Sequence, residues 1–231
     1  VGAPMMQKRL LAISLVFCVN LAISQETPEW QIADAAELAA MCGVCHGPTM
    51  NGSTRRDGPA LVGLSADYIA RQLRGYAEES RGYDNRDVLG KFMVRMNGMF
   101  RNEETIVAVA EYIANNYTPN SEEHDARPRA WLWQSEYGSF DLTNGDAASG
   151  QNLYATCAAC HGVYGEGMQT MFTDKLIHFS GDYLARQLQY FRDGIRGAEP
   201  GDTFGNLMAP MAANLSDQDI ADLITYITSE L

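Results

Sequence analysis

The sequence contains few cysteines, few histidines and few positive charges. Its 231 residues include five cysteines and four histidines, and 17 lysines and arginines stand against 29 acidic residues. The resulting net charge of −12 argues against binding to nucleic acid or anionic lipid and favours partners with basic docking surfaces. Four cysteines fall within two short motifs and the fifth, Cys18, lies in the N-terminal segment, so none remains for a structural disulfide.

The sequence also lacks sustained alternation of apolar and polar residues, which is the pattern of half-buried strands. We therefore expect little or no β-sheet. The glycine-rich stretch from Gly162 to Gly167 has no surrounding strand and helix pattern, which argues against a phosphate-binding loop. Apolar residues make up 46% of the chain, enough for a hydrophobic core.

Residues 1–24 have the layout of a secretory signal peptide. Lys8 and Arg9 precede an apolar run from Leu10 to Ile23, and Ala22-Ile23-Ser24 offers small residues at a cleavage point. The run is shorter than the roughly 20 apolar residues of a membrane span, so cleavage is favoured over retention as an anchor. We therefore predict export to the periplasm, and a mature chain with 15 basic and 29 acidic residues.

The two cysteine motifs have the same form, Cys-x-x-Cys-His, at residues 42–46 and 157–161. This spacing is the attachment signal for c-type haem, in which two thiols form thioethers with the porphyrin vinyl groups and the adjacent histidine ligates the iron. Two such groups indicate a protein that transfers electrons. We predict two covalently bound haem c groups, held by Cys42, Cys45, Cys157 and Cys160 and ligated by His46 and His161.

Cys-x-x-Cys pairs also occur in dithiol redox proteins and in zinc sites. Neither copy here lies in the alternating strand and helix pattern of a dithiol oxidoreductase. Zinc needs four ligands, and the first half offers no further cysteine or histidine near its motif besides His46. Both alternatives are therefore weaker than haem attachment.

The chain is an internal duplication with an offset of 115 residues. At this offset the two haem motifs align, and Asp-Tyr-Ile-Ala-Arg-Gln-Leu at 67–73 aligns with Asp-Tyr-Leu-Ala-Arg-Gln-Leu at 182–188. Chance similarity does not keep the same register across two separate segments. Each half is therefore expected to form its own domain.

Apolar spacing in both halves predicts helices. The last helix of the second half is expected to start at Ser216-Asp217-Gln218-Asp219, which resembles a capping box. Its counterpart in the first half should begin near Asn102. The apolar stripes that follow are Ile220, Leu223, Ile224 and Ile227, and Ile106, Val109 and Ile113.

A charged segment rich in turn residues separates the halves at residues 119–143 and predicts an exposed linker. His124 within it is expected to be solvated. Trp131 and Trp133 interrupt the polarity, and they either fasten the linker to the domains or form a docking patch for a partner. The expected organisation is a signal peptide at 1–24, a haem domain at 25–118, the linker, and a second haem domain at 144–231.

A second axial ligand is expected downstream of each motif, just before the final helix of each half. A methionine thioether would stabilise ferrous iron and raise the reduction potential, as suits an electron carrier. The second half offers Met208 and Met211, and the first offers Met93, Met96 and Met99. Because methionines at such spacing commonly fill cores, only one in each half is expected to bind iron.

Together, the duplicated Cys-x-x-Cys-His, the Tyr-x-x-x-Gln-Leu helix and the methionine-rich segment before a final helix resemble the diheme cytochrome c4 family. The resemblance implies an all-α fold of two tandem class I cytochrome c-like haem domains, related by a pseudo-twofold axis, with the haems facing each other across the domain interface. It also implies Met208, eight residues before Ser216, and Met96 as the iron ligands. Met93, Met99 and Met211 are the alternatives.

The family places a proline after each haem motif, and the carbonyl of this proline accepts a hydrogen bond from the axial histidine. Pro59 fits that position in the first half, whereas the second half has Asp174. A carboxylate near His161 would give the imidazole more anionic character and lower the potential of the second haem. His178 is a weaker alternative ligand near the second haem.

These patterns predict an exported diheme electron carrier between redox proteins. The resemblance suggests a cytochrome complex as donor and a terminal oxidase as acceptor. An alternative is the electron-transfer subunit of a periplasmic dehydrogenase that oxidises sulfide or an alcohol. A diheme enzyme would need an open or unusual sixth position on one iron, but the mature chain has no cysteine outside the two haem motifs and each half has a well-placed methionine.

Overall fold

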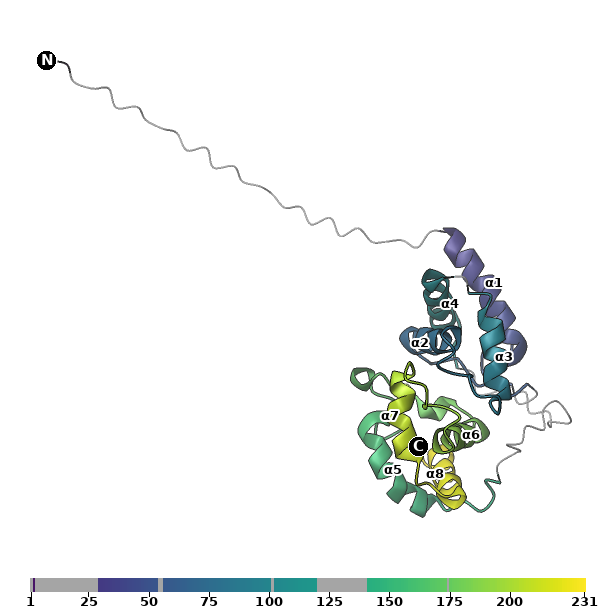
Figure 1. Cartoon of the computed structure of the whole chain (residues 1–231), viewed down its shortest axis with the longest axis vertical. Helices are drawn as coiled ribbons and strands as arrows, with labels where there is room; N and C mark the ends of the chain where they lie inside the picture. The colour runs from purple at the N-terminus through teal and green to yellow at the C-terminus, as the bar shows by residue number, and fades with distance from the viewer. Residues whose placement is uncertain (1, 3–28, 54–55, 101, 120–140, 174) are drawn as a thin grey trace.

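The computed structural model describes residue 2 and residues 29–53, 56–100, 102–119, 141–173 and 175–231. Within these ranges every regular element is a helix, and the only β-type pairing is an isolated bridge between Ser53 and Gly58. The expected all-α fold of two domains is confirmed, and Figure 1 shows the two helical bundles one above the other. None of the described helices has the length and apolarity needed to cross a membrane.

The first bundle contains α1 (Glu29–His46), α2 (Ala66–Ala77), α3 (Val88–Asn97) and α4 (Glu103–Asn116). Helix α4 packs against both α1 and α2, and α3 packs against α2. The second bundle contains α5 (Ala147–His161), α6 (Gly181–Arg192), α7 (Thr203–Ala212) and α8 (Asp217–Ser229), with the short 3-10 turns η1 (Gln169–Met171) and η2 (Leu176–His178). Here α8 packs against α5 and α6, and α6 packs against α7.

The two bundles repeat each other in detail. Ser65 and Ser180, 115 residues apart, cap the N-termini of α2 and α6 through their hydroxyls. Asp87 and Asp202 cap α3 and α7 in the same way. The offset drops to 114 for α4 and α8, because the loop before the final helix is one residue shorter in the second half.

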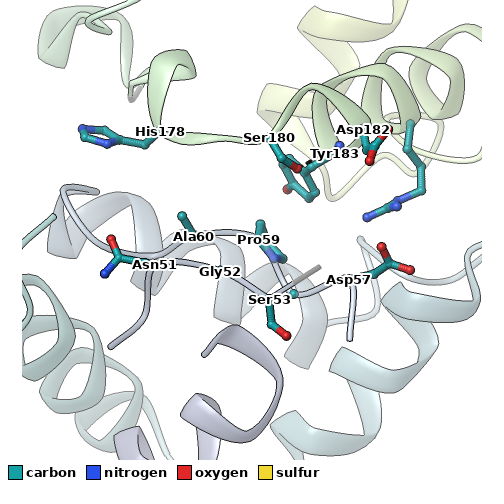
Figure 2. Close-up of a pocket in the computed structure, with 12 residues that line it drawn as sticks. Asn51, Gly52, Ser53, Asp57, Pro59, Ala60, His178, Ser180, Asp182 and Tyr183 are labelled. Carbon is teal, nitrogen blue, oxygen red and sulfur yellow. Dashed lines mark hydrogen bonds between the residues drawn. The ribbon is translucent and has the colours of Figure 1, made fainter. Parts of the chain in front are cut away.

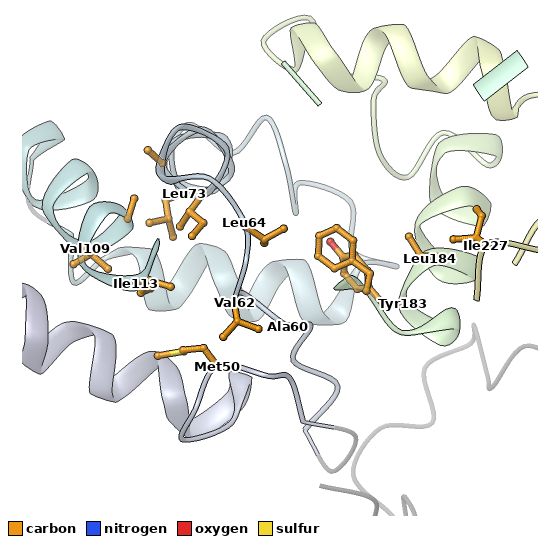
Figure 3. Packing of buried hydrophobic residues seen from close by; sticks show 14 of the residues in the cluster. Met50, Ala60, Val62, Leu64, Leu73, Val109, Ile113, Tyr183, Leu184 and Ile227 are labelled. Carbon is orange, nitrogen blue, oxygen red and sulfur yellow. The ribbon is translucent and has the colours of Figure 1, made fainter. Parts of the chain in front are cut away.

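The final helices start where the sequence predicts. Asn102 caps α4 by accepting a hydrogen bond from the Thr105 amide, and Ser216 forms a capping box with Asp219. The residues of the predicted apolar stripes, among them Val109 and Ile113 of α4, are buried in the core of each bundle. Figure 3 shows these side chains together with apolar residues of α2 and the loop before it.

Both bundles belong to one buried apolar cluster, so their cores meet at the interface. Leu64 of the first half lies beside Tyr183 of the second in Figure 3. Hydrogen bonds also cross the interface, from the Tyr83 hydroxyl to the Gly194 carbonyl at 3.0 Å and from Arg71 to the Phe172 carbonyl at 2.6 Å. The predicted signal peptide apart from residue 2 lies outside the described residues, and so do His124, Trp131, Trp133 and Asp174.

Candidate haem-binding sites

The first candidate site is built on the C-terminal turns of α1, which carry Cys42, Cys45 and His46. His46 is only 6% exposed, and its Nδ1 lies 2.8 Å from the Pro59 carbonyl oxygen. Because a carbonyl only accepts, Nδ1 carries the proton and Nε2 keeps the lone pair that can bind iron. Burial lowers the pKa of His46 more than the bond to Pro59 raises it, so the ring is held neutral. The expected hydrogen bond between His46 and the Pro59 carbonyl is confirmed.

A close approach between two backbone segments holds this arrangement. A Cβ atom on Gly58 would lie 2.1 Å from the Cys45 carbonyl oxygen, so only glycine fits here without moving the backbone. The Gly52 amide also donates to the His46 carbonyl at 2.9 Å. These contacts bring Pro59, the next residue after Gly58, against the His46 ring.

The second candidate site has the same frame but a different support for its histidine. His161 ends α5 and is half-buried. Its Nδ1 is buried and has no hydrogen-bond partner among the described residues, whose range omits Asp174. Burial lowers the pKa of His161, so this imidazole is also neutral and able to coordinate iron.

The backbone approach found at Gly58 is replaced by a side-chain hydrogen bond in the second half. Thr173 occupies the position 115 residues after Gly58, and its hydroxyl donates to the Cys160 carbonyl oxygen at 2.5 Å. The two motifs therefore share a helix end but differ in the loop that supports it.

The first thiol of each motif is not activated as a nucleophile. Burial raises the pKa of Cys42 to about 11 and raises the pKa of Cys157 above its usual value. A dithiol oxidoreductase needs a cysteine with a lowered pKa, because the thiolate is the nucleophile. Among the described residues no three Cys, His, Asp or Glu side chains gather as a metal site, which also weakens the zinc interpretation.

The candidate methionines lie on equivalent helices, α3 and α7. With the offset of 115 shared by the caps of these helices, Met93 corresponds to Met208 and Met96 corresponds to Met211. Met93 packs against the apolar core and Met208 is half-buried, whereas Met211 is 49% exposed. Met99 lies past the end of α3. Met96 therefore stays a prediction, and the register favours Met93 as the partner of Met208.

Large apolar side chains lie exposed next to both motifs and both methionine-bearing helices. Phe92 and Leu207 occupy equivalent positions on α3 and α7. Such exposed apolar surface beside neutral histidines fits a porphyrin, whose faces need apolar cover. The other exposed members are Met41, Val44, Val163, Tyr164, Met168, Met171, Phe172 and Met211.

His178 lies at the interface between the halves. A Cβ on Gly63 of the first half would be 2.7 Å from His178 Nε2, so the imidazole packs against that backbone. Figure 2 shows His178 and Tyr183 above the first-half loop that carries Asn51 and Pro59, with a small pocket between them. The second half thus covers the loop that supports His46.

The family model for cytochrome c matches this chain twice, at residues 32–116 and 147–230. The chain belongs to the cytochrome c family. Cytochrome c4 of Azotobacter vinelandii is 29% identical over 191 residues, which cover 82% of this chain and 84% of that protein. The crystal structure of reduced recombinant cytochrome c4 from Pseudomonas stutzeri superposes with a TM-score of 0.58 at 26% identity, covering 84% of this chain and 95% of that one.

These likenesses place the chain in the diheme cytochrome c4 family, with two covalently bound haem c groups and an electron-carrier character. The chain is also related to a protein named thiosulfate dehydrogenase electron acceptor from Stutzerimonas stutzeri, at 24% identity over 84% of this chain and 81% of that protein. The expectation of an electron carrier rather than an enzyme agrees with these relatives.

Two features of the cytochrome were not anticipated from its sequence. Thr173 was not expected to support the second motif, and Arg81 and Arg196 were not expected to join the domains. The sequence did contain a signal for the shared role of the arginines, because they lie 115 residues apart and each follows a repeated helix.

Proposed function

We propose that this cytochrome is an exported diheme carrier that takes electrons from one redox protein and delivers them to another. The observation that carries the proposal is that each domain pairs a helix ending in Cys-x-x-Cys-His with a methionine-bearing helix. The two domains also share one apolar cluster. Haem supplies the one-electron chemistry between ferrous and ferric iron. The protein buries His46, half-buries His161, keeps both imidazoles neutral and packs the two domains against each other.

For the axial ligands we propose His46 and His161 on one side and Met93 and Met208 on the other. The neutral Nε2 of each histidine and a thioether sulfur form the donor set of a carrier whose ferrous state is stabilised. Met93 replaces Met96 in this proposal because it occupies the position equivalent to Met208. Near-infrared spectroscopy of the ferric protein tests the pair, since methionine-ligated haem has its own charge-transfer band.

Partners with basic docking surfaces are supported by the acidic composition. With 29 acidic and 17 basic residues, the chain attracts such a surface over long range, and salt screens that attraction. Oxidation of the reduced carrier by a basic acceptor should therefore slow as ionic strength rises. A rate independent of salt would count against this docking mode, and an N-terminal sequence that retains residues 1–24 would count against cleavage after export.

A second candidate function is an electron-accepting subunit bound to a dehydrogenase. The relative named thiosulfate dehydrogenase electron acceptor favours it. Purification of the native protein distinguishes the two functions. A free carrier elutes at the mass of its own chain, and a subunit elutes together with a catalytic protein that reduces it on adding substrate.

A further inference from the structure

The loops that follow the two haem motifs share one backbone course but carry different side chains. Both loops have the same length from the axial histidine to the serine that caps the next helix, so positions 115 residues apart are equivalent. Four equivalent pairs have left-handed backbone angles: Gly47 and Gly162 (φ 84° and 82°), Met50 and Gly165 (60° and 65°), Gly52 and Gly167 (89° and 78°), and Asp57 and Phe172 (54° and 56°). The first loop is therefore a position-by-position reference for the second.

Four exposed apolar side chains of the second loop have polar counterparts in the first loop. They are Tyr164, Met168, Met171 and Phe172, with exposed fractions of 68%, 37%, 45% and 60%, and we call them the loop patch. The equivalent residues of the first loop are Thr49, Ser53, Arg56 and Asp57.

Cover for the porphyrin does not account for the loop patch. Both domains are haem domains, so a position that must shield the haem should be apolar in both. The methionine-bearing helices meet this condition, since Phe92 corresponds to Leu207 and Met96 corresponds to Met211. The loop patch does not meet it, because polar or charged residues hold the same positions in the first domain. Its apolar surface therefore serves something that the first domain does not share.

The backbone of Phe172 gives a second, independent reason to expect a function. Its φ of 56° lies in the left-handed region, which is costly for a bulky side chain and easier for an aspartate such as Asp57. The ring gains no deep burial in return. Arg71 donates to the Phe172 carbonyl at 2.6 Å, and the ring packs on Phe204 of α7 with centroids 5.5 Å apart. A strained residue held in place at the surface points to a binding role.

The charge around the loop patch indicates what binds there. Residues 144–231 contain 11 acidic and four basic side chains, whereas residues 25–118 contain 13 and nine. Within residues 162–173 the single charged side chain is Glu166. The complementary partner therefore has an apolar patch with basic residues around it. Because Tyr164 comes three residues after His161, such a partner binds next to the helix end that holds the second haem.

We propose that the loop patch is the docking site of a redox protein whose own surface is apolar at the centre and basic around it. The proposal rests on the carrier function proposed above and names the surface that this function uses. One electron passes between the second haem iron and the partner's redox centre, so that one is oxidised as the other is reduced. The acidic domain attracts the partner, and the aromatic side chains provide the contact area that such residues supply at interfaces. The first domain, whose loop is polar, is left for a different partner.

The test replaces residues of the loop patch by residues suited to the first loop. Tyr164→Thr copies Thr49, and Phe172→Asn suits the left-handed backbone without adding a charge. The matched control is Met41→Thr, which removes a 46% exposed methionine of α1 and copies Thr156, its counterpart in the second half. The reduced holoprotein is mixed by stopped flow with a lysine-rich ferric cytochrome c of the mitochondrial type, at low and high ionic strength. Ferricyanide serves as a small oxidant that needs no docking surface.

The second-order rate constant with the basic cytochrome should fall about tenfold in each loop-patch variant and stay within about twofold of the wild type in the control. The rates with ferricyanide and both reduction potentials should not change. The ratio between variant and wild type should persist at high salt, because salt screens charge attraction and not apolar contact.

Equal slowing with ferricyanide, or a shifted potential of the second haem, would show that the loop patch covers the haem, and the proposal would be wrong. Unchanged rates in both variants, or a wild type that reduces ferricyanide but not the basic cytochrome, also overturn it. A wild-type dimer that dissociates in the variants, with unchanged rates, would make the patch a contact between two copies instead. A chain without two haems, or one that does not reduce ferricyanide, overturns the carrier function itself. If either variant does not mature, Met168→Ser takes its place with the same expected result.

Discussion

Replacement of Gly58 by alanine tests how the first axial histidine is held. The added Cβ would lie 2.1 Å from the Cys45 carbonyl oxygen, and ordinary contact begins near 3.4 Å, so the loop must move by about 1.3 Å. Pro59 follows in the chain and would move with it. A shift of that size stretches the 2.8 Å bond between His46 Nδ1 and the Pro59 carbonyl beyond hydrogen-bonding distance.

The expected cost has two parts. Overpacking costs about 1 to 3 kcal/mol, and leaving a buried donor unsatisfied costs about 1 to 3 kcal/mol. A loss of at least about 2 kcal/mol lowers the melting temperature of a chain this size by roughly 4 °C or more. The potential of the first haem should rise, because the bond to Pro59 makes the imidazole a stronger donor that favours ferric iron.

The matched control is Gly43→Ala. Gly43 lies inside the same haem motif, but its Cβ would meet nothing nearer than 3.5 Å, and the second motif already has Ala158 at that position. Thermal melting and redox titration of the two variants are compared with the wild type. If Gly58→Ala behaves like Gly43→Ala in both assays, the close backbone approach does not hold His46 and the reasoning fails.

Four further predictions concern the iron ligands, the second axial histidine and the final helix. Met93→Leu should abolish the near-infrared methionine band of one haem while Met96→Leu leaves both bands, and the reverse result would restore the assignment from family resemblance. Asp174→Asn should raise the potential of the second haem if this carboxylate approaches its histidine, and an unchanged potential discards that hypothesis. Ser216→Ala should cost about 1 kcal/mol by removing the cap of α8. The hydrogen bond from Ser216 lowers the pKa of Asp219. The ionised Asp219 therefore stabilises the fold slightly at neutral pH, and this stabilisation is lost as pH falls below ~4. Acid titration of the wild type and Asp219→Asn checks this.

The local features of this fold could be predicted because they depend on short sequence signals. The start of α8 at Ser216 and the start of α4 after Asn102 come from side chains that act within one helical turn, and the duplication is visible directly as a repeat in the sequence. The role of Pro59 came from family resemblance and depends on Gly58 being able to approach Cys45.

Features that depend on two distant segments could not be predicted in this way. The offset of 115 pairs Met93 with Met208 in the sequence, but only the helix bounds show that this offset holds through α3 and α7 and falls to 114 at the final helices. The contacts of Arg81 and Arg196 required the domain interface, since their partners lie more than 100 residues away in the sequence.

The most direct test of the central claim is the intact mass of the purified, denatured chain. Covalent attachment through both motifs predicts a polypeptide that keeps two haem masses after denaturation. A chain that carries one haem mass, or none, would contradict the account of two haem domains.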